Sequence, residues 1–207
     1  MDKKKSGKNT LLMSVLMSSP GPLVVGLGLM VGQSSTQLAD FVRRSAELLS
    51  IIMAFVVYSI TSKDTDATRK LRLERLTNYF VGGAMCLSGI AMLFIALFSE
   101  NTEKGNVIPG LSIALMGVIA NSLFWRKYTK LSKETSNAIL SVQARLYRAK
   151  TFVDTCVTIA LLSVLLLPES QISFYLDMIG SVIVAIYLIW SGIKTVKEQG
   201  QTENVSE

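Results

Sequence analysis

The sequence predicts an all-α membrane protein with six transmembrane helices and with both termini in the cytoplasm. Half of its 207 residues are hydrophobic and only 17% are charged, which is far from the composition of an ordinary soluble domain. The apolar residues gather in six long stretches, and the basic residues gather in alternate connections between those stretches. These observations predict the fold class, because a bilayer demands long apolar helices and sorts the loops between them by charge.

The six apolar stretches each hold about 18 residues or more, the length that a helix needs to cross roughly 30 Å of hydrocarbon. They lie at 11–32, 36–60, 78–98, 107–125, 150–167 and 173–193. We therefore expect a transmembrane domain over residues 11–197, between a basic cytoplasmic N-terminus, residues 1–10, and a polar tail, residues 198–207. Loops are predicted at 61–77 and 126–145, and no soluble domain is expected.

The first apolar stretch contains prolines and small residues. Pro20 and Pro22 each lack a backbone donor and clash with the preceding helical turn, so a bend is expected there. Glycines on the same stretch would let another helix approach closely, because they have no side chain. They are Gly21, Gly26, Gly28 and Gly32. The first span is therefore predicted to be bent and closely packed.

The lysines and arginines predict the orientation, because short loops rich in them stay in the cytoplasm. The N-terminal segment, the loops at 61–77 and 126–145 and the tail hold most of these residues, whereas the opposite loops hold only Lys104. Both ends should therefore lie in the cytoplasm, in a multi-pass protein of the cell membrane (inner or plasma membrane). The net charge of +6 reflects this topology and contact with anionic membrane lipid, so no nucleic-acid binding is expected.

The sequence lacks the residue patterns of an enzyme or of a resident cofactor. It contains no histidine, which is the commonest zinc ligand and the usual proton-transfer side chain near neutral pH. Cys86 and Cys156 lie in predicted spans without metal-ligand spacing, so we expect them to be small packing residues. There is no paired nucleophile and base and no phosphate-binding glycine loop. No enzymatic activity and no cofactor are therefore expected.

Charged residues inside the predicted spans carry the functional information, because an unpaired charge at mid-membrane costs about 3 kcal/mol or more. Arg43 and Glu47 are four residues apart on the second span, and Lys150 and Asp154 are four apart on the fifth. Residues with this spacing share one face of a helix. Two helices therefore each offer one cation and one carboxylate, and we expect these four side chains to line a common polar cavity.

Further polar residues lie near this cluster. Asp40 precedes Arg43 and Arg44 by one helical turn, Asn121 lies on the fourth span, and Asp177 lies near the outer end of the sixth. We interpret Asp40, Asp177 and Asn121 as secondary residues of the same pathway.

The order of several segments resembles that of the cation diffusion facilitator family of metal efflux transporters. The segments are SSTQLADFVRRSAELLS, TRKLRLERLTNYFVGG, NSLFWRKYTKLSKETSNAILSVQARLYRAKTFVDT and YLDMIGSVIVAIYLIWSGIKTVKE, which open or form the second, third, fifth and sixth spans. The resemblance covers about residues 10–200. It implies a six-span homodimer that exports a divalent cation in exchange for protons. The cytoplasmic C-terminal domain of many family members has no counterpart here.

The resemblance also implies where a metal would bind. Family members carry a histidine or aspartate followed four residues later by an aspartate, on the second and again on the fifth span. These pairs fall here on Arg43 with Glu47 and on Lys150 with Asp154, so only the carboxylates keep the metal-binding chemistry. Zn²⁺ needs about four neutral or anionic donor atoms, whereas arginine and lysine offer only hydrogen-bond donors. Glu47 and Asp154 are the candidate metal ligands, and a conventional zinc site is not expected.

Three interpretations of the four-residue cluster remain open. In the first, Lys150 loses its proton when desolvated and frees the carboxylates for a transported cation or proton. In the second, Arg43 and Lys150 permanently neutralise Glu47 and Asp154, and the protein is a structural or regulatory membrane protein that transports nothing. In the third, the fixed cations have adapted the site to an anionic or zwitterionic solute. Asp40 and Asp177 match acidic positions of the family, and either form an acidic patch on the exit route or pair with Arg44.

Overall fold

The computed structural model describes residues 3–31, 35–62, 66–98, 108–166 and 171–201, and nearly all of them are helical. The helices are α1 (Lys3–Ser18), α2 (Pro20–Val31), α3 (Ser35–Thr61), α4 (Ala67–Phe98), α5 (Ile108–Thr135), α6 (Ala138–Leu166) and α7 (Gln171–Gln201). Helices α1 and α2 together correspond to the first predicted span, so the helices form six spans. Over the described residues, the predicted all-α class is confirmed.

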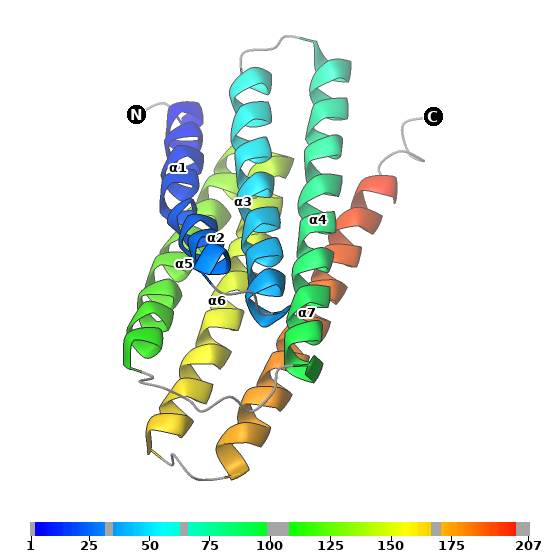
Figure 1. Cartoon of the computed structure of the whole chain (residues 1–207). Coiled ribbons are helices and arrows are strands. Elements are labelled where there is room, and N and C mark those ends of the chain that lie inside the picture. The colour runs from blue at the N-terminus through cyan, green and yellow to red at the C-terminus, as the bar shows by residue number, and fades with distance from the viewer. Residues whose placement is uncertain (1–2, 32–34, 63–65, 99–107, 167–170, 202–207) are drawn as a thin grey trace.

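The helices run up and down in one bundle (Figure 1). The first residues of α1, α4 and α6 and the last residues of α3, α5 and α7 lie at one end, which we call the basic end. The segments that the charge pattern assigns to the cytoplasm thus share one end of the molecule. Within the described residues, Phe41–Thr61, Ala67–Phe98 and Met178–Glu198 are long and apolar enough by themselves to cross a membrane.

The predicted bend in the first span is confirmed, since α1 ends at Ser18 and α2 begins at Pro20. Proline fits the first position of a helix, where its missing N–H has no helical acceptor. Beyond the bend, Gly21 and Gly26 bring α2 against α3. A Cβ atom at Gly26 would lie 3.1 Å from the Phe41 ring, and one at Gly21 would lie 3.4 Å from Arg44 Nη1. Gly28 and Gly32 lie outside the part of the chain whose packing the structure describes.

The predicted loops at 61–77 and 126–145 are wrong in extent, because helix continues through most of both segments. Asp66 caps α4 by accepting hydrogen bonds from the Thr68 and Arg69 backbone N–H groups, at 3.0 and 3.2 Å. Asn137 caps α6 in the same way through the Leu140 N–H, at 3.1 Å. Hydropathy marks where the bilayer ends, whereas capping residues mark where a helix ends.

Helix α6 extends from the fifth predicted span toward the basic end and has an inward face there, formed by Leu140, Ala144 and Tyr147. All three side chains are buried on α6.

Helices α4 and α7 pack with backbone close to backbone. A Cβ atom at Gly192 would lie 2.6 Å from the Gly82 carbonyl oxygen, and one at Gly89 would lie 2.8 Å from the Ala185 carbonyl oxygen. The Cys86 thiol fits into the same contact and donates to the Ile189 carbonyl oxygen at 3.7 Å. Because glycine alone permits this distance, these positions determine the packing of the third span on the sixth.

The substitution Gly89→Leu should separate α4 from α7 and lower the free energy of unfolding by about 2 kcal/mol, because overpacking forces the backbones apart. The matched control is Gly83→Leu on the same helix, where a Cβ atom meets nothing within 4 Å. Thermal unfolding of both variants in detergent measures the difference. Equal melting temperatures would contradict the close packing.

Candidate ion pathway between helices α3 and α6

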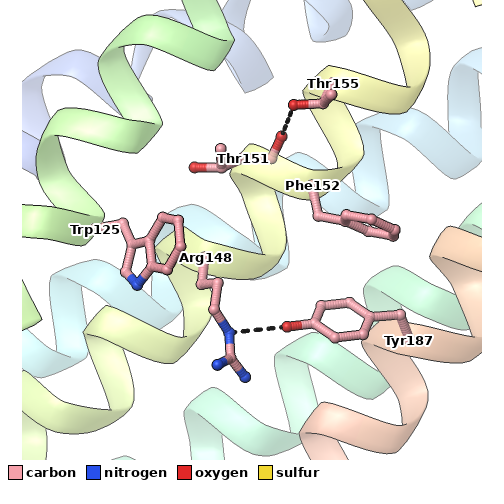
Figure 2. Close-up of a pocket in the computed structure, with 6 residues that line it drawn as sticks. All are labelled: Trp125, Arg148, Thr151, Phe152, Thr155 and Tyr187. Atoms are coloured by element: carbon pink, nitrogen blue, oxygen red, sulfur yellow. Dashed lines mark hydrogen bonds between the residues drawn. The ribbon is translucent and has the colours of Figure 1, made fainter. Parts of the chain in front are cut away.

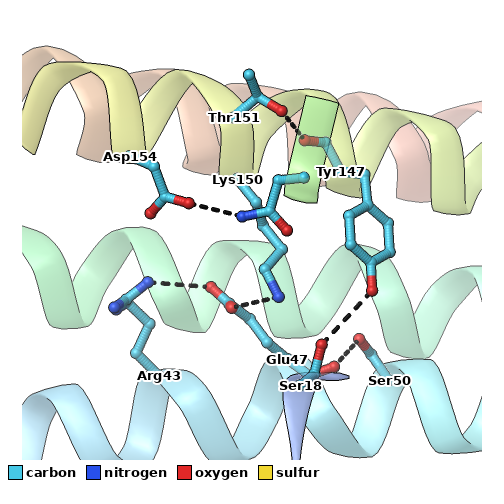
Figure 3. A network of polar contacts seen from close by, with 9 residues as sticks. Ser18, Arg43, Glu47, Ser50, Tyr147, Lys150, Thr151 and Asp154 are labelled. Atoms are coloured by element: carbon cyan, nitrogen blue, oxygen red, sulfur yellow. Dashed lines mark hydrogen bonds and ion pairs between the residues drawn. The ribbon is translucent and has the colours of Figure 1, made fainter. Parts of the chain in front are cut away.

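The Glu47 carboxylate is the centre of a buried ion network (Figure 3). Glu47 lies on α3 and is 5% exposed. Its Oε1 atom lies 3.3 Å from Arg43 Nη1, one turn earlier on the same helix. Its Oε2 atom lies 3.3 Å from Lys150 Nζ on α6. Each carboxylate oxygen therefore faces its own cation, and the second ion pair joins two helices.

This ion pair crosses a boundary between helices that otherwise have different neighbours. Helix α3 packs mainly against α4, α1 and α2, whereas α6 packs mainly against α5 and α7. Lys150 reaches across from α6 with its ammonium group 5.3 Å from the centre of the Tyr147 ring, a distance that suits a cation–π contact. The boundary between α3 and α6 is therefore lined by charged groups.

Asp154 lies one turn further along α6 and faces α5. Its Oδ2 atom accepts a hydrogen bond from Asn121 Nδ2 at 2.6 Å. Gly117, one turn before Asn121 on α5, makes room for the carboxylate, because a Cβ atom there would lie 2.5 Å from Oδ2. Among the described residues, Oδ1 of Asp154 has no hydrogen-bond partner. Asp154 therefore has a neutral partner, whereas Glu47 has two cations.

The structure thus brings together most of the residues selected from the sequence. Arg43, Glu47 and Lys150 form one network, and Asp154 pairs with Asn121 beside it. Asp40 and Asp177 belong to α3 and α7, but their side chains lie outside the described part of the structure, so their pairing and any role on an exit route remain predictions.

A layer of aromatic rings, for which the sequence predicted no role, lies between this network and the basic end. It consists of Phe124 and Tyr128 on α5 and Tyr147 on α6, with ring centres 5.1 to 6.2 Å apart. The Tyr128 hydroxyl lies 2.7 Å from the Ser14 hydroxyl. Tyr147 OH lies 3.5 Å from Ser18 Oγ. The sequence feature that could have indicated this layer is the pair Ser14 and Ser18, four residues apart on the first span, which places both hydroxyls on one face of the helix. We call Phe124, Tyr128 and Tyr147 the tyrosine layer.

The donor atoms of this region do not fit a site for a soft metal. Within the described ranges, no three histidine, cysteine, aspartate or glutamate residues lie close enough together to hold a metal ion. The groups that could face a cation are the oxygen atoms of Glu47, Asp154 and Asn121. Oxygen atoms suit hard cations, whereas Zn²⁺ sites are usually completed by cysteine or histidine. Any cation passing here would be a transported substrate rather than a resident cofactor.

Comparison with known families identifies the chain. The family model described as "Cation efflux transmembrane domain" matches residues 11–202. The chain belongs to the cation efflux family. A search of curated proteins finds no significant match. As a cation efflux protein, the chain belongs to a family of multi-pass membrane cation transporters and not of enzymes. The family match also confirms the resemblance in the sequence to cation diffusion facilitators and the six-span fold.

The substitution Glu47→Gln should lower the free energy of unfolding by about 3 kcal/mol, because it leaves two buried cations without their carboxylate. A matched control is Glu134→Gln, which removes an exposed carboxylate at the basic end of α5. Thermal unfolding in detergent measures both. If the two variants melt at the same temperature, Glu47 does not neutralise Arg43 and Lys150 in the folded protein.

Proposed function

We propose that this cation efflux protein exchanges its cation for protons at the boundary between α3 and α6, with Glu47 and Asp154 as the groups that bind both. The observation that carries the proposal is the contrast between the two buried acids. Glu47 lies between two cations, whereas the one hydrogen-bond partner of the Asp154 side chain among the described residues is the Asn121 amide. Glu47 is therefore ion-paired, whereas Asp154 is available to a ligand.

Asp154 is the first binding group in this proposal. Its Oδ1 atom has no hydrogen bond among the described residues, and the Asn121 side chain offers a carbonyl oxygen after rotation of its amide. Two such oxygens, completed by water, suit a hard cation. Gly117 lets the carboxylate lie directly against α5, because a Cβ atom there would clash with Oδ2.

Lys150 supplies the coupling to protons. With Arg43 and Lys150 charged and both acids ionised, the cluster has no net charge. A cation that enters beside Glu47 and Asp154 repels the Lys150 ammonium and favours loss of its proton, which a desolvated amine can release. Arg43 stays charged, because a guanidinium does not deprotonate in proteins. Release of this proton offsets one unit of the positive charge that the cation brings into the buried cluster.

The surrounding helices supply the route. Transporters commonly alternate access by rocking helices around a site near mid-membrane. In this proposal the tyrosine layer is the barrier on the side of the basic end, because Tyr128 and Tyr147 are fully buried there. We also expect a homodimer in the cell membrane with the basic end in the cytoplasm, in keeping with the positive-inside rule.

A second candidate function is favoured by the pairing of Glu47. Its two oxygens already have cationic partners, so the network needs no bound ion to be stable. A transporter-derived subunit that moves nothing would keep such a network for structure alone. The two candidates differ in proton movement.

The substitution Asp154→Asn should abolish proton movement driven by a cation gradient in proteoliposomes, because it removes the ionisable ligand while keeping the hydrogen-bonding shape. A pH-sensitive dye inside the vesicles measures the flux for a series of divalent cations. Glu134→Gln, an exposed change on α5, should transport normally. Unchanged flux in Asp154→Asn would overturn the role of this acid, and a wild-type protein without flux would favour the structural candidate.

The substitution Lys150→Arg separates proton coupling from ion pairing. Arginine keeps the positive charge beside Glu47 but does not release its proton. We therefore expect a melting temperature close to that of the wild type together with a loss of proton flux. Lys133→Arg, at an exposed position on α5, serves as the control. Full flux in Lys150→Arg would show that no proton leaves this amine during transport.

A further inference from the structure

A groove separate from the ion network opens on the side of the bundle between α5, α6 and α7 (Figure 2). Its volume is about 450 Å³. The lining residues are Trp125, Arg148, Thr151, Phe152, Thr155 and Tyr187. Arg148 and Phe152 are exposed, and the remaining four are half-buried, so the groove is open to its surroundings. Neither the family match nor the proposed transport mechanism gives this groove a role.

Of the described residues that line the groove, Arg148 carries a positive charge and none is acidic. Arg148 Nε donates to the Tyr187 hydroxyl oxygen at 3.0 Å, which holds the guanidinium at the groove. Among the described residues, no carboxylate pairs with Arg148, and its two terminal nitrogens have no hydrogen-bond partner. The indole N–H of Trp125 likewise has no partner in the described ranges. The polar groups of Arg148 and Trp125 that have no partner in the described ranges are therefore N–H donors.

The two threonines add no competing donor. Thr151 donates its hydroxyl hydrogen to the Tyr147 carbonyl oxygen at 2.9 Å, and Thr155 donates to the Thr151 carbonyl oxygen at 2.8 Å. Their hydrogens are thus used within α6, and they present methyl groups and oxygen lone pairs to their surroundings. A ligand that matches this groove has anionic oxygens at Arg148 and apolar atoms beside Phe152.

The depth of the groove identifies the source of such a ligand. Arg148 lies directly before the apolar stretch of α6, and Trp125 lies directly before Arg126, where the apolar stretch of α5 ends. Tryptophan and tyrosine concentrate at this level of a bilayer, where head groups meet hydrocarbon. Phe152 lies one turn deeper than Arg148 on α6. The groove therefore runs from the head-group level into the hydrocarbon.

We infer that the groove binds an anionic phospholipid, with the phosphate at the Arg148 guanidinium and an acyl chain along Phe152. Basic pockets between transmembrane helices on the cytoplasmic side suit phosphate head groups. A lipid satisfies both halves of the groove at once, whereas a soluble anion would leave the apolar half unfilled. This inference rests on the membrane topology and not on the transport mechanism, so either can fail without the other.

The two tryptophans of the chain allow a direct test. In a Trp190→Phe protein, Trp125 is the single tryptophan and reports on the groove. The protein is reconstituted in equal mixtures of phosphatidylglycerol and phosphatidylcholine, with bromine on the acyl chains of one lipid or the other. Brominated phosphatidylglycerol should quench Trp125 with about five-fold preference over brominated phosphatidylcholine, the preference expected of one basic side chain near a membrane surface.

Arg148→Gln in this background should reduce the preference to nearly one, because Arg148 is the one cation among the described residues that line the groove. The control is Lys133→Gln on α5, which removes an equal charge at the basic end of the bundle but outside the groove. This variant should keep the preference. If Arg148→Gln does not fold, Tyr187→Phe replaces it. That variant removes the hydroxyl that holds Arg148 and should lower the preference about two-fold, which corresponds to the low end of the net contribution of one hydrogen bond.

Four results would overturn the inference. Equal quenching by both lipids in the otherwise wild-type protein would show no selectivity for the anionic head group. An equal loss in Lys133→Gln would show general attraction of the basic end. Protection of Trp125 from both brominated lipids would assign the groove to a second copy of the chain. Loss of the preference in millimolar inorganic phosphate would assign it to a soluble anion.

Discussion

The burial of the Glu47 charge is the constraint on which the centre of this molecule depends. A carboxylate at this depth is stable only with partners, and the chain supplies one from the same helix and one from another helix. The local partner, Arg43, follows from helical spacing. The distant partner, Lys150, exists only if α6 stands beside α3. The ion pair therefore fixes the relative position of two helices that pack mostly against other neighbours.

In the proposed transport cycle, Arg43 and Lys150 stand where the resemblance to the family implies metal ligands, and this changes what the cycle must accomplish. In a site of acids alone, a metal ion or protons must compensate the charge at every step. Here Arg43 and Lys150 are cations that pair with Glu47 within the chain. In the proposed cycle, a substrate cation therefore displaces a positive charge rather than filling a negative cavity. Lys150 is the one member of the pair that can lose its charge, and this distinguishes it from Arg43.

Sequence reasoning reached the spans and the cluster, because hydropathy and a spacing of four residues are local properties of a chain. It did not find that Asp154 turns to Asn121 instead of Lys150, because spacing identifies a face of α6 but not the neighbouring helix that this face meets. The helix ends beyond the bilayer were missed for a similar reason, since Asp66 and Asn137 act by capping and not by hydropathy. The tyrosine layer was not predicted because it forms only where α1, α5 and α6 meet, and local sequence patterns do not show which helices meet.

The glycine contacts between α4 and α7 have a mechanical consequence. With Gly82 and Gly192 bringing one backbone against the other, neither helix can rotate or slide without a steric clash. Any relative movement of these two helices would therefore first require their backbones to separate.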